Sequence, residues 1–176
     1  MLMRSAATIP AYCLRVAIDM VITGIGMLSA FADSLDELYT AIKNGVYAGG
    51  STQMPVHEKD KRLLFADDLS KKAFLAADKA LSDSDTVQSC DYKDKAGIFL
   101  GNSFGSLKSQ RKFEEALAMN DLKSAMPMDF VNTVMNAPAG QLAIFFGLEG
   151  MNVTTASGSR AAVDALIYAD EMIREG

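Results

Sequence analysis

The residues best placed to do chemistry lie in the last quarter of the chain, around Ser159. Residues 153–155 are a β-prone Val-Thr-Thr run, and residues 156–158, Ala-Ser-Gly, are small and bendable. A strand that turns sharply into a helix places the residue at the bend beside unpaired N–H groups and the positive end of the helix dipole. That is the layout of a nucleophile elbow, so the sequence predicts Ser159 as a candidate nucleophile. The alternative is an ordinary first-turn helix residue.

Ser159 has no activating group in its own sequence neighbourhood. A serine hydroxyl needs an adjacent general base, and a dipole effect of about 1 kcal/mol is far short of what its ionisation demands. The surrounding residues, Gly158 and Arg160, do not form a Gly-x-Ser-x-Gly pattern. The single histidine, His57, lies in a polar stretch far upstream, and Cys90 lies in an exposed connector with nothing to activate it. A serine-dependent acyltransferase or hydrolase therefore stays open only as an alternative.

Composition and motifs argue against several other functions. The net charge of −5 comes without a basic stripe, which excludes nucleic acid as an expected partner. No Cys/His cluster has metal-ligand spacing, and Gly24-x-Gly26 lacks the third glycine of a dinucleotide fingerprint, so we expect no metal and no cofactor. No apolar run approaches the roughly 20 residues that span a bilayer. Two cysteines, Cys13 and Cys90, fit a reducing cytoplasm.

The elements that must position Ser159 can be predicted from periodicity and caps. Short apolar runs bounded by glycine predict strands, and helical spacing after Ser159 predicts a helix with one apolar face. Together they predict an α/β protein whose parallel strands are joined by right-handed crossovers and covered by helices on both faces. The predicted strands are 21–25, 97–100 and 153–155. The predicted helices are 34–44, capped by Ser34, then 67–81, 106–119, one with Pro138 near its first turn that ends at Gly147, and one from Ser159 with Ala162, Ala165, Leu166, Ala169, Met172 and Ile173 on its apolar face.

Several of these stretches, in the same order, resemble a known family. Residues 132–152 end in Phe146-Gly147-Leu148-Glu149-Gly150-Met151-Asn152 and run directly into the bend. This stretch resembles the N-terminal half of the β-ketoacyl synthases, condensing enzymes of the thiolase fold. Residues 21–29, 38–45 and 97–105 are similar to the family's first strand, first helix and second strand. The resemblance covers most of the chain from Val21 onward.

The resemblance implies a fold, a division of the chain and a set of partners. We expect the N-terminal half of a thiolase-like fold over residues 20–176, as a truncated β-ketoacyl synthase-like domain, preceded by an N-terminal extension at residues 1–19. It places Ser159 where the family carries its nucleophilic cysteine, so the site is expected to be degenerate. It also implies acyl carrier protein as a partner, and a homodimer, or a heterodimer with a complete β-ketoacyl synthase.

The resemblance also bears on whether the chain is active. In the family, the second half supplies two catalytic histidines, a lysine and the glycine-rich oxyanion loop, and the chain stops before that half. We therefore expect no condensation by the isolated chain. One alternative is a non-catalytic relative similar to the chain-length factors of polyketide systems, which carry an Asp-Ala pair in the same helix, as at Asp164-Ala165. Another is the N-terminal piece of an active condensing acyltransferase of fatty acid or polyketide biosynthesis.

Overall fold

Two short parallel strands form the centre of the described structure. The computed structural model describes residues 20–32, 34–46, 63–64, 66–84, 93–120 and 127–175. Strand β1 (Ile98–Gly101) pairs in parallel with β2 (Asn152–Thr155), and Gly101 lies opposite Thr155. Because the strands are parallel, their carboxyl ends meet at the same edge of the sheet. That edge leads directly into the bend that carries Ser159.

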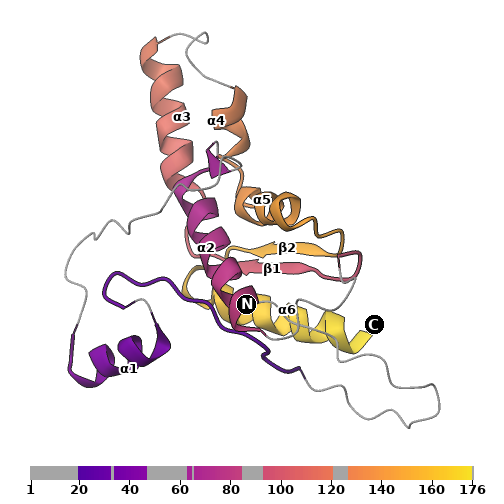
Figure 1. Ribbon diagram of the computed structural model, residues 1–176. Coiled ribbons are helices and arrows are strands. Elements are labelled where there is room, and N and C mark those ends of the chain that lie inside the picture. Colours follow the sequence, from indigo (N-terminus) through magenta and orange to yellow (C-terminus); the bar gives the residue numbers. More distant parts are fainter. Residues whose placement is uncertain are drawn as a thin grey trace.

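Helices make up most of the rest of the described structure (Figure 1). Most end within two residues of the predicted bounds. In chain order they are α1 (Leu35–Lys43), α2 (Asp68–Asp83), α3 (Leu107–Asn120), α4 (Pro127–Val131), α5 (Ala137–Phe146), a 3-10 turn (Gly158–Arg160) and α6 (Ala161–Glu175).

The two faces of the sheet are covered by different helices. Helix α5 contacts both strands on one face, and α6 contacts both on the other, as Figure 1 shows. Helix α2 packs in turn against α5 and forms an outer layer. The predicted α/β class, with a parallel sheet and helices on both faces, is confirmed. Helix α1 stands apart and buries none of its residues.

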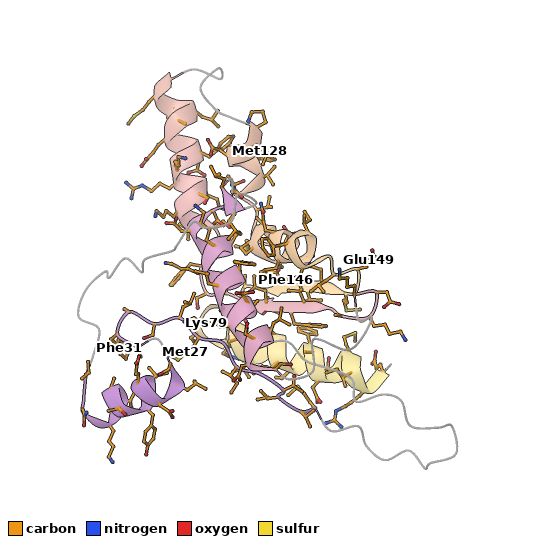
Figure 2. All side chains as sticks on the ribbon, viewed as in Figure 1. Met27, Phe31, Lys79, Met128, Phe146 and Glu149 are labelled. Carbon is orange, nitrogen blue, oxygen red and sulfur yellow. The ribbon has the colours of Figure 1, made fainter. Side chains whose placement is uncertain are left out.

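An apolar cluster between α2 and α5 fixes the outer layer. Phe74 of α2 is 9% exposed, and its ring centroid lies 3.9 Å from that of Phe145 and 5.4 Å from that of Phe146. Phe146 is labelled in Figure 2. Leu63, Ala66 and Leu142 complete the buried part of the cluster. Burying a large apolar side chain stabilises a protein by roughly 1.5–3 kcal/mol. This cluster therefore holds α5, and with it the approach to β2, in place.

Local sequence signals account for the ends of several helices. The Ser34 hydroxyl accepts a hydrogen bond from the N–H of Glu37, as a capping residue should. Asp67 does the same for Ser70 at the start of α2. Pro138 lies in the first turn of α5, where no helical hydrogen bond is lost, and Gly147 ends that helix at φ +65°. The predictions for Ser34, Pro138 and Gly147 are confirmed.

The predicted strand at residues 21–25 is wrong. Apart from an isolated bridge at Ile22, this segment forms no strand, and it runs along α2 instead. The Ile25 N–H donates to the Asp83 carboxylate at 2.9 Å. At Gly24 and Gly26, an added Cβ would lie 2.2 and 2.0 Å from carbonyl oxygens of α2. The glycines therefore serve close packing against a helix, a use that a short apolar run does not reveal.

The apolar face predicted for the last helix is largely confirmed. Ala165 and Ala169 are buried, and Leu166, Met172 and Ile173 are half-buried. The exception is Ala162, which is exposed, while its neighbour Ala161 is buried. The stripe of alanines at every fourth position lets α6 lie close to the strands.

Some predictions fall on residues that the structure does not describe. These include the extension at residues 1–19 and the side chains of Cys13, His57 and Cys90. Within the described ranges, no helix is long and apolar enough to cross a membrane. The same residues contain no group of three or more His, Cys, Asp or Glu side chains that could hold a metal ion.

Candidate functional site: the bend between the second strand and the last helix

The candidate site lies where the two parallel strands end. The N–H of Asn102, just past β1, donates to the carbonyl of Thr155 at 3.0 Å and continues the pairing by one residue. The Thr155 hydroxyl donates to the carbonyl of Ala161 at 2.7 Å. That bond spans the bend, because it joins the last residue of β2 to the first residue of α6. The bend is therefore tied to the sheet on one side and to the helix on the other.

Gly101 allows the helix to approach this closely. A Cβ built on Gly101 would lie 2.2 Å from the carbonyl oxygen of Ala161 and 2.6 Å from the Cα of Ala162. Both contacts are with backbone atoms, which cannot move aside as the tip of a side chain can. The first turn of α6 therefore packs directly against the end of β1, and this contact fixes the position of the bend.

The bend itself is a single 3-10 turn. Gly158 has φ +67°, in the left-handed region that favours glycine, and nothing lies within 4 Å of where its Cβ would be. The Gly158 carbonyl accepts from the N–H of Ala161 and from the Ser103 hydroxyl, the latter at 3.0 Å. Ser159 follows, exposed, at the start of the helical segment. The predicted strand–turn–helix geometry around Ser159 is confirmed.

A carboxylate in the first full turn of α6 is engaged by residues on both sides of Ser159. Asp164 accepts a hydrogen bond from the Ser157 hydroxyl. Its other oxygen, Oδ1, lies 3.3 Å from the Arg160 guanidinium. The Asp164 side chain is 20% exposed, against 78% for Arg160. Asp164 thus links the residue two before Ser159 to the residue directly after it.

The side chains beside the bend border an open hollow along α6. Ser157, Asp164 and Tyr168 line it, together with Thr155, Ala156, Ile167 and Glu171. Ser159 is not among the lining residues. Ser157 and the contact it makes with Asp164 were missed by the sequence analysis, which noted Asp164 only through the family resemblance. The two are seven residues apart, and only the shape of the bend brings them together.

The hydroxyl of Ser159 has no general base beside it among the described residues. We find no hydrogen bond from Ser159 to any of them, and Asp164 is occupied by Ser157 and Arg160. The first N–H groups of a helical segment can stabilise an anion held at the bend. The arrangement therefore offers a place for an anion, without the means to generate a nucleophile from a serine.

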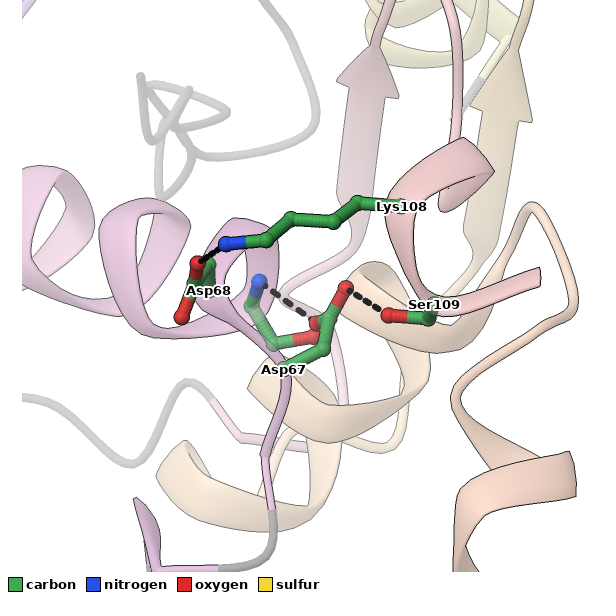
Figure 3. Close-up of polar contacts among 5 residues, drawn as sticks. Asp67, Asp68, Lys108 and Ser109 are labelled. Atoms are coloured by element: carbon green, nitrogen blue, oxygen red, sulfur yellow. Dashed lines mark hydrogen bonds and ion pairs between the residues drawn. The ribbon is translucent and has the colours of Figure 1, made fainter. Parts of the chain in front are cut away.

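A further ion pair joins the starts of α2 and α3, away from the bend (Figure 3). Lys108 forms an ion pair and hydrogen bond with Asp68, which lowers the pKa of that carboxyl below its ordinary value of 3.8. The Ser109 hydroxyl donates to Asp67, the capping residue of α2, at 3.3 Å. These contacts hold the starts of α2 and α3 together and do not involve the residues of the bend.

Comparison with known proteins covers most of the chain. Residues 56–176 match the family model described as "Beta-ketoacyl synthase, N-terminal domain". Among curated proteins, the chain is similar to 3-oxoacyl-[acyl-carrier-protein] synthase 2 of Vibrio cholerae serotype O1, with 22% identity over 178 residues. It is also 21% identical over 175 residues to 3-oxoacyl-[acyl-carrier-protein] synthase 1 of Haemophilus influenzae. Each match covers 89% of this chain but only 42% and 43% of the relative, so the chain spans less than half their length.

Solved structures show the same fold. One holds a type II PKS acyl-carrier protein in complex with its ketosynthase bound to the hexaketide, with a TM-score of 0.76 and 22% identity. Another is the ishigamide ketosynthase/chain length factor, with a TM-score of 0.73 and 22% identity. These matches cover 89% of this chain and 46% and 49% of the matched chains. They extend the likeness to the three-dimensional arrangement of the elements around the bend.

Proposed function

Because the chain belongs to the β-ketoacyl synthase family through that family's N-terminal domain, we propose that it handles acyl chains carried on acyl carrier protein in fatty acid or polyketide biosynthesis. We further propose that it does not condense acyl groups by itself. The observation that carries this second part is the environment of Ser159, a serine at the bend without a base among the described residues. No cofactor is part of the proposal.

The chemistry of condensation explains why the bend alone is insufficient. The nucleophile must first accept an acyl group from a thioester, a step that suits a thiolate far better than a serine hydroxyl. A malonyl thioester must then lose CO₂, and positioned donors must stabilise the resulting enolate oxygen. The sequence has one histidine, His57, and it lies outside the described residues. Among the described residues near Ser159 we therefore identify no base for acyl transfer and no donor for the enolate oxygen.

This environment favours a supporting role in a larger assembly. We propose a cytoplasmic protein that forms a homodimer, or a heterodimer with a complete β-ketoacyl synthase, and contributes a wall to the acyl channel. The matched structure of a ketosynthase/chain length factor supports such an assembly for the fold, and the acyl-carrier-protein complex supports the carrier as partner. The N-terminal piece of an active synthase remains the second candidate, favoured by the share of the relatives that the match covers.

Condensation assays test the proposal that the chain does not condense acyl groups by itself. The chain is incubated with acyl-loaded and malonyl-loaded acyl carrier protein, alone and as Ser159→Cys. We expect no β-ketoacyl product from either protein, because a thiol at the bend still lacks the groups that stabilise the enolate. Product formed by the wild-type chain alone would contradict the proposal. Product formed only by Ser159→Cys would show that the chain can stabilise the enolate by itself, which would also contradict the proposal.

Assembly is tested separately by sedimentation at micromolar concentration. We expect the chain to sediment as a homodimer, or as a heterodimer when its complete partner β-ketoacyl synthase is added. A chain that stays monomeric and binds no added synthase would contradict the proposed dimer or heterodimer. The proposed partnership with acyl carrier protein is tested separately, by measuring whether the chain binds acyl carrier protein.

A further inference from the structure

The face of α6 that points away from the strands carries exposed apolar side chains. Ala161, Ala165 and Ala169 are buried on the side that packs against the sheet. Val163 and Ile167 lie on the other side of the helix and are 54% and 49% exposed. Because they are four residues apart, their side chains lie one above the other along the same face. The described structure therefore leaves an apolar strip of α6 open.

Opposite charges lie at the two ends of this strip. Arg160 lies one turn before Val163, and its side chain is 78% exposed. Glu171 lies one turn after Ile167 and is exposed as well. A guanidinium has five N–H donors, so the contact of Arg160 with Asp164 at 3.3 Å leaves donors for a second carboxylate. The strip is thus basic at one end, apolar in the middle and acidic at the other end.

A hollow borders the strip on one side. Ile167, Tyr168 and Glu171 line it, and its volume is about 580 Å³. Tyr168 is half-exposed there and adds an aromatic ring beside the apolar strip. Side chains of a helix laid along α6 can enter this hollow, so the face can take up another helix.

The strip is complementary to itself when two α6 helices meet antiparallel. A two-fold axis between Val163 and Ile167 sets each Val163 against the Ile167 of the other copy. The same axis brings each Arg160 to within one residue, about 1.5 Å of helix rise, of the level of the other copy's Glu171. A parallel pairing would instead set Arg160 against Arg160 and Glu171 against Glu171. The charges therefore favour the antiparallel arrangement, in which each dimer contains two pairs of opposite charge.

We propose that this face of α6 binds the same face of a second copy of the chain. The inference rests on the homodimer of the proposed function and names its contact surface. A closed two-fold contact uses the same patch on both copies, which is what a self-complementary strip provides. The occupant of the hollow beside α6 is then the α6 helix of the second copy.

The apolar middle of the strip is tested by sedimentation equilibrium of the full chain over a range of concentrations. We expect a reversible equilibrium between monomer and dimer. Ile167→Ser should raise the Kd of the dimer at least about tenfold, because each dimer loses two buried apolar side chains. Ile144→Ser is the matched control, since Ile144 is an isoleucine of α5 that is 84% exposed. It should leave the Kd unchanged.

Charge reversal tests the two ends of the strip. Arg160→Glu and Glu171→Arg should each raise the Kd by about tenfold, because each creates two pairs of like charge in the dimer. An equimolar mixture of the two variants should associate as wild type does, since the mixed dimer again contains two pairs of opposite charge. Arg111→Glu is the matched control and should leave the Kd unchanged. Arg111 is 79% exposed and also forms an i,i+4 ion pair, with Glu115, but in α3.

Three results would overturn the proposal, and each leaves a different part of the proposed function standing. A dimer that Ile167→Ser does not weaken would place the homodimer contact on another face. Charge-reversed variants that fold, by circular dichroism, but do not recover association on mixing would exclude the antiparallel contact. A chain that is monomeric at every concentration would exclude the homodimer, and its binding to a complete synthase would then support the heterodimer alone. Binding of acyl carrier protein is measured separately and tests only the proposed function.

Discussion

Gly101 lies directly beneath the carbonyl oxygen of Ala161, only 2.2 Å from where a Cβ on Gly101 would be. The contact joins the end of β1 to the first residue of α6. It is made between two main chains, so it fixes the height of the bend above the sheet. The position of Ser159 therefore depends on a glycine more than fifty residues earlier in the chain.

The first prediction concerns that glycine. Gly101→Ala should destabilise the protein by roughly 1–3 kcal/mol, because the new methyl group must displace backbone in a packed region. Gly140→Ala is the matched control, since Gly140 lies inside α5 and nothing is within 4 Å of its added Cβ. It should stabilise the protein by about 0.5–1 kcal/mol through helix propensity. Chemical denaturation of both variants measures the difference, and equal effects would contradict the close approach.

The second prediction concerns the charge at Asp164. In a Ser159→Cys background, Asp164→Asn removes a carboxylate and releases Arg160 from its ion pair. Both changes favour a thiolate at position 159. The rate of alkylation at neutral pH should therefore rise by about two- to threefold, the size expected of exposed charges.

Glu115→Gln provides the control in that background. It breaks another exposed i,i+4 pair, with Arg111 at 2.7 Å, but in α3 and away from the bend. Its alkylation rate should match that of Ser159→Cys alone. An Asp164→Asn rate that is unchanged or slower would mean that Asp164 does not act on position 159.

The third prediction concerns the pH dependence of stability. The hydrogen bond and charge of Lys108 lower the pKa of Asp68, so this pair stabilises the folded state above the ordinary carboxyl pKa of 3.8. The stabilisation is lost as the pH falls through the lowered folded pKa. Lys108→Met should therefore have a lower unfolding midpoint than wild type at neutral pH, and the difference should vanish in acid.

The effect should be small and sensitive to salt, because both side chains are largely exposed. Thermal unfolding of wild type and Lys108→Met between neutral pH and about pH 2 measures it. A difference in midpoint that persists unchanged at the acidic end would contradict the assignment to the Asp68 carboxylate.

The sequence predicted those features whose causes are local. The cap at Ser34, the proline at the start of α5 and the left-handed Gly147 each act within a few residues, and all are observed. The strand–turn–helix at Ser159 is equally local. The family resemblance added the order of the elements, which periodicity alone could not supply.

What the sequence did not predict depends on contacts between distant segments. The residues expected to form the first strand pack instead on α2 through Gly24 and Gly26, and a glycine gives no sign of which neighbour it accommodates. The contact between Ser157 and Asp164 forms only because a 3-10 turn precedes α6. In each case a backbone detail decided the outcome.

The most direct test of the account asks whether Ser159 can accept an acyl group. Wild type and Ser159→Cys are incubated with an acyl thioester, and the modified residue is located by mass spectrometry of the digested chain. We expect no stable acyl group on Ser159 of the wild type. We expect acylation at position 159 of the cysteine variant, because a thiol there needs less activation than a serine hydroxyl. Stable acylation of wild-type Ser159 by the chain alone would contradict the account and identify a serine acyltransferase.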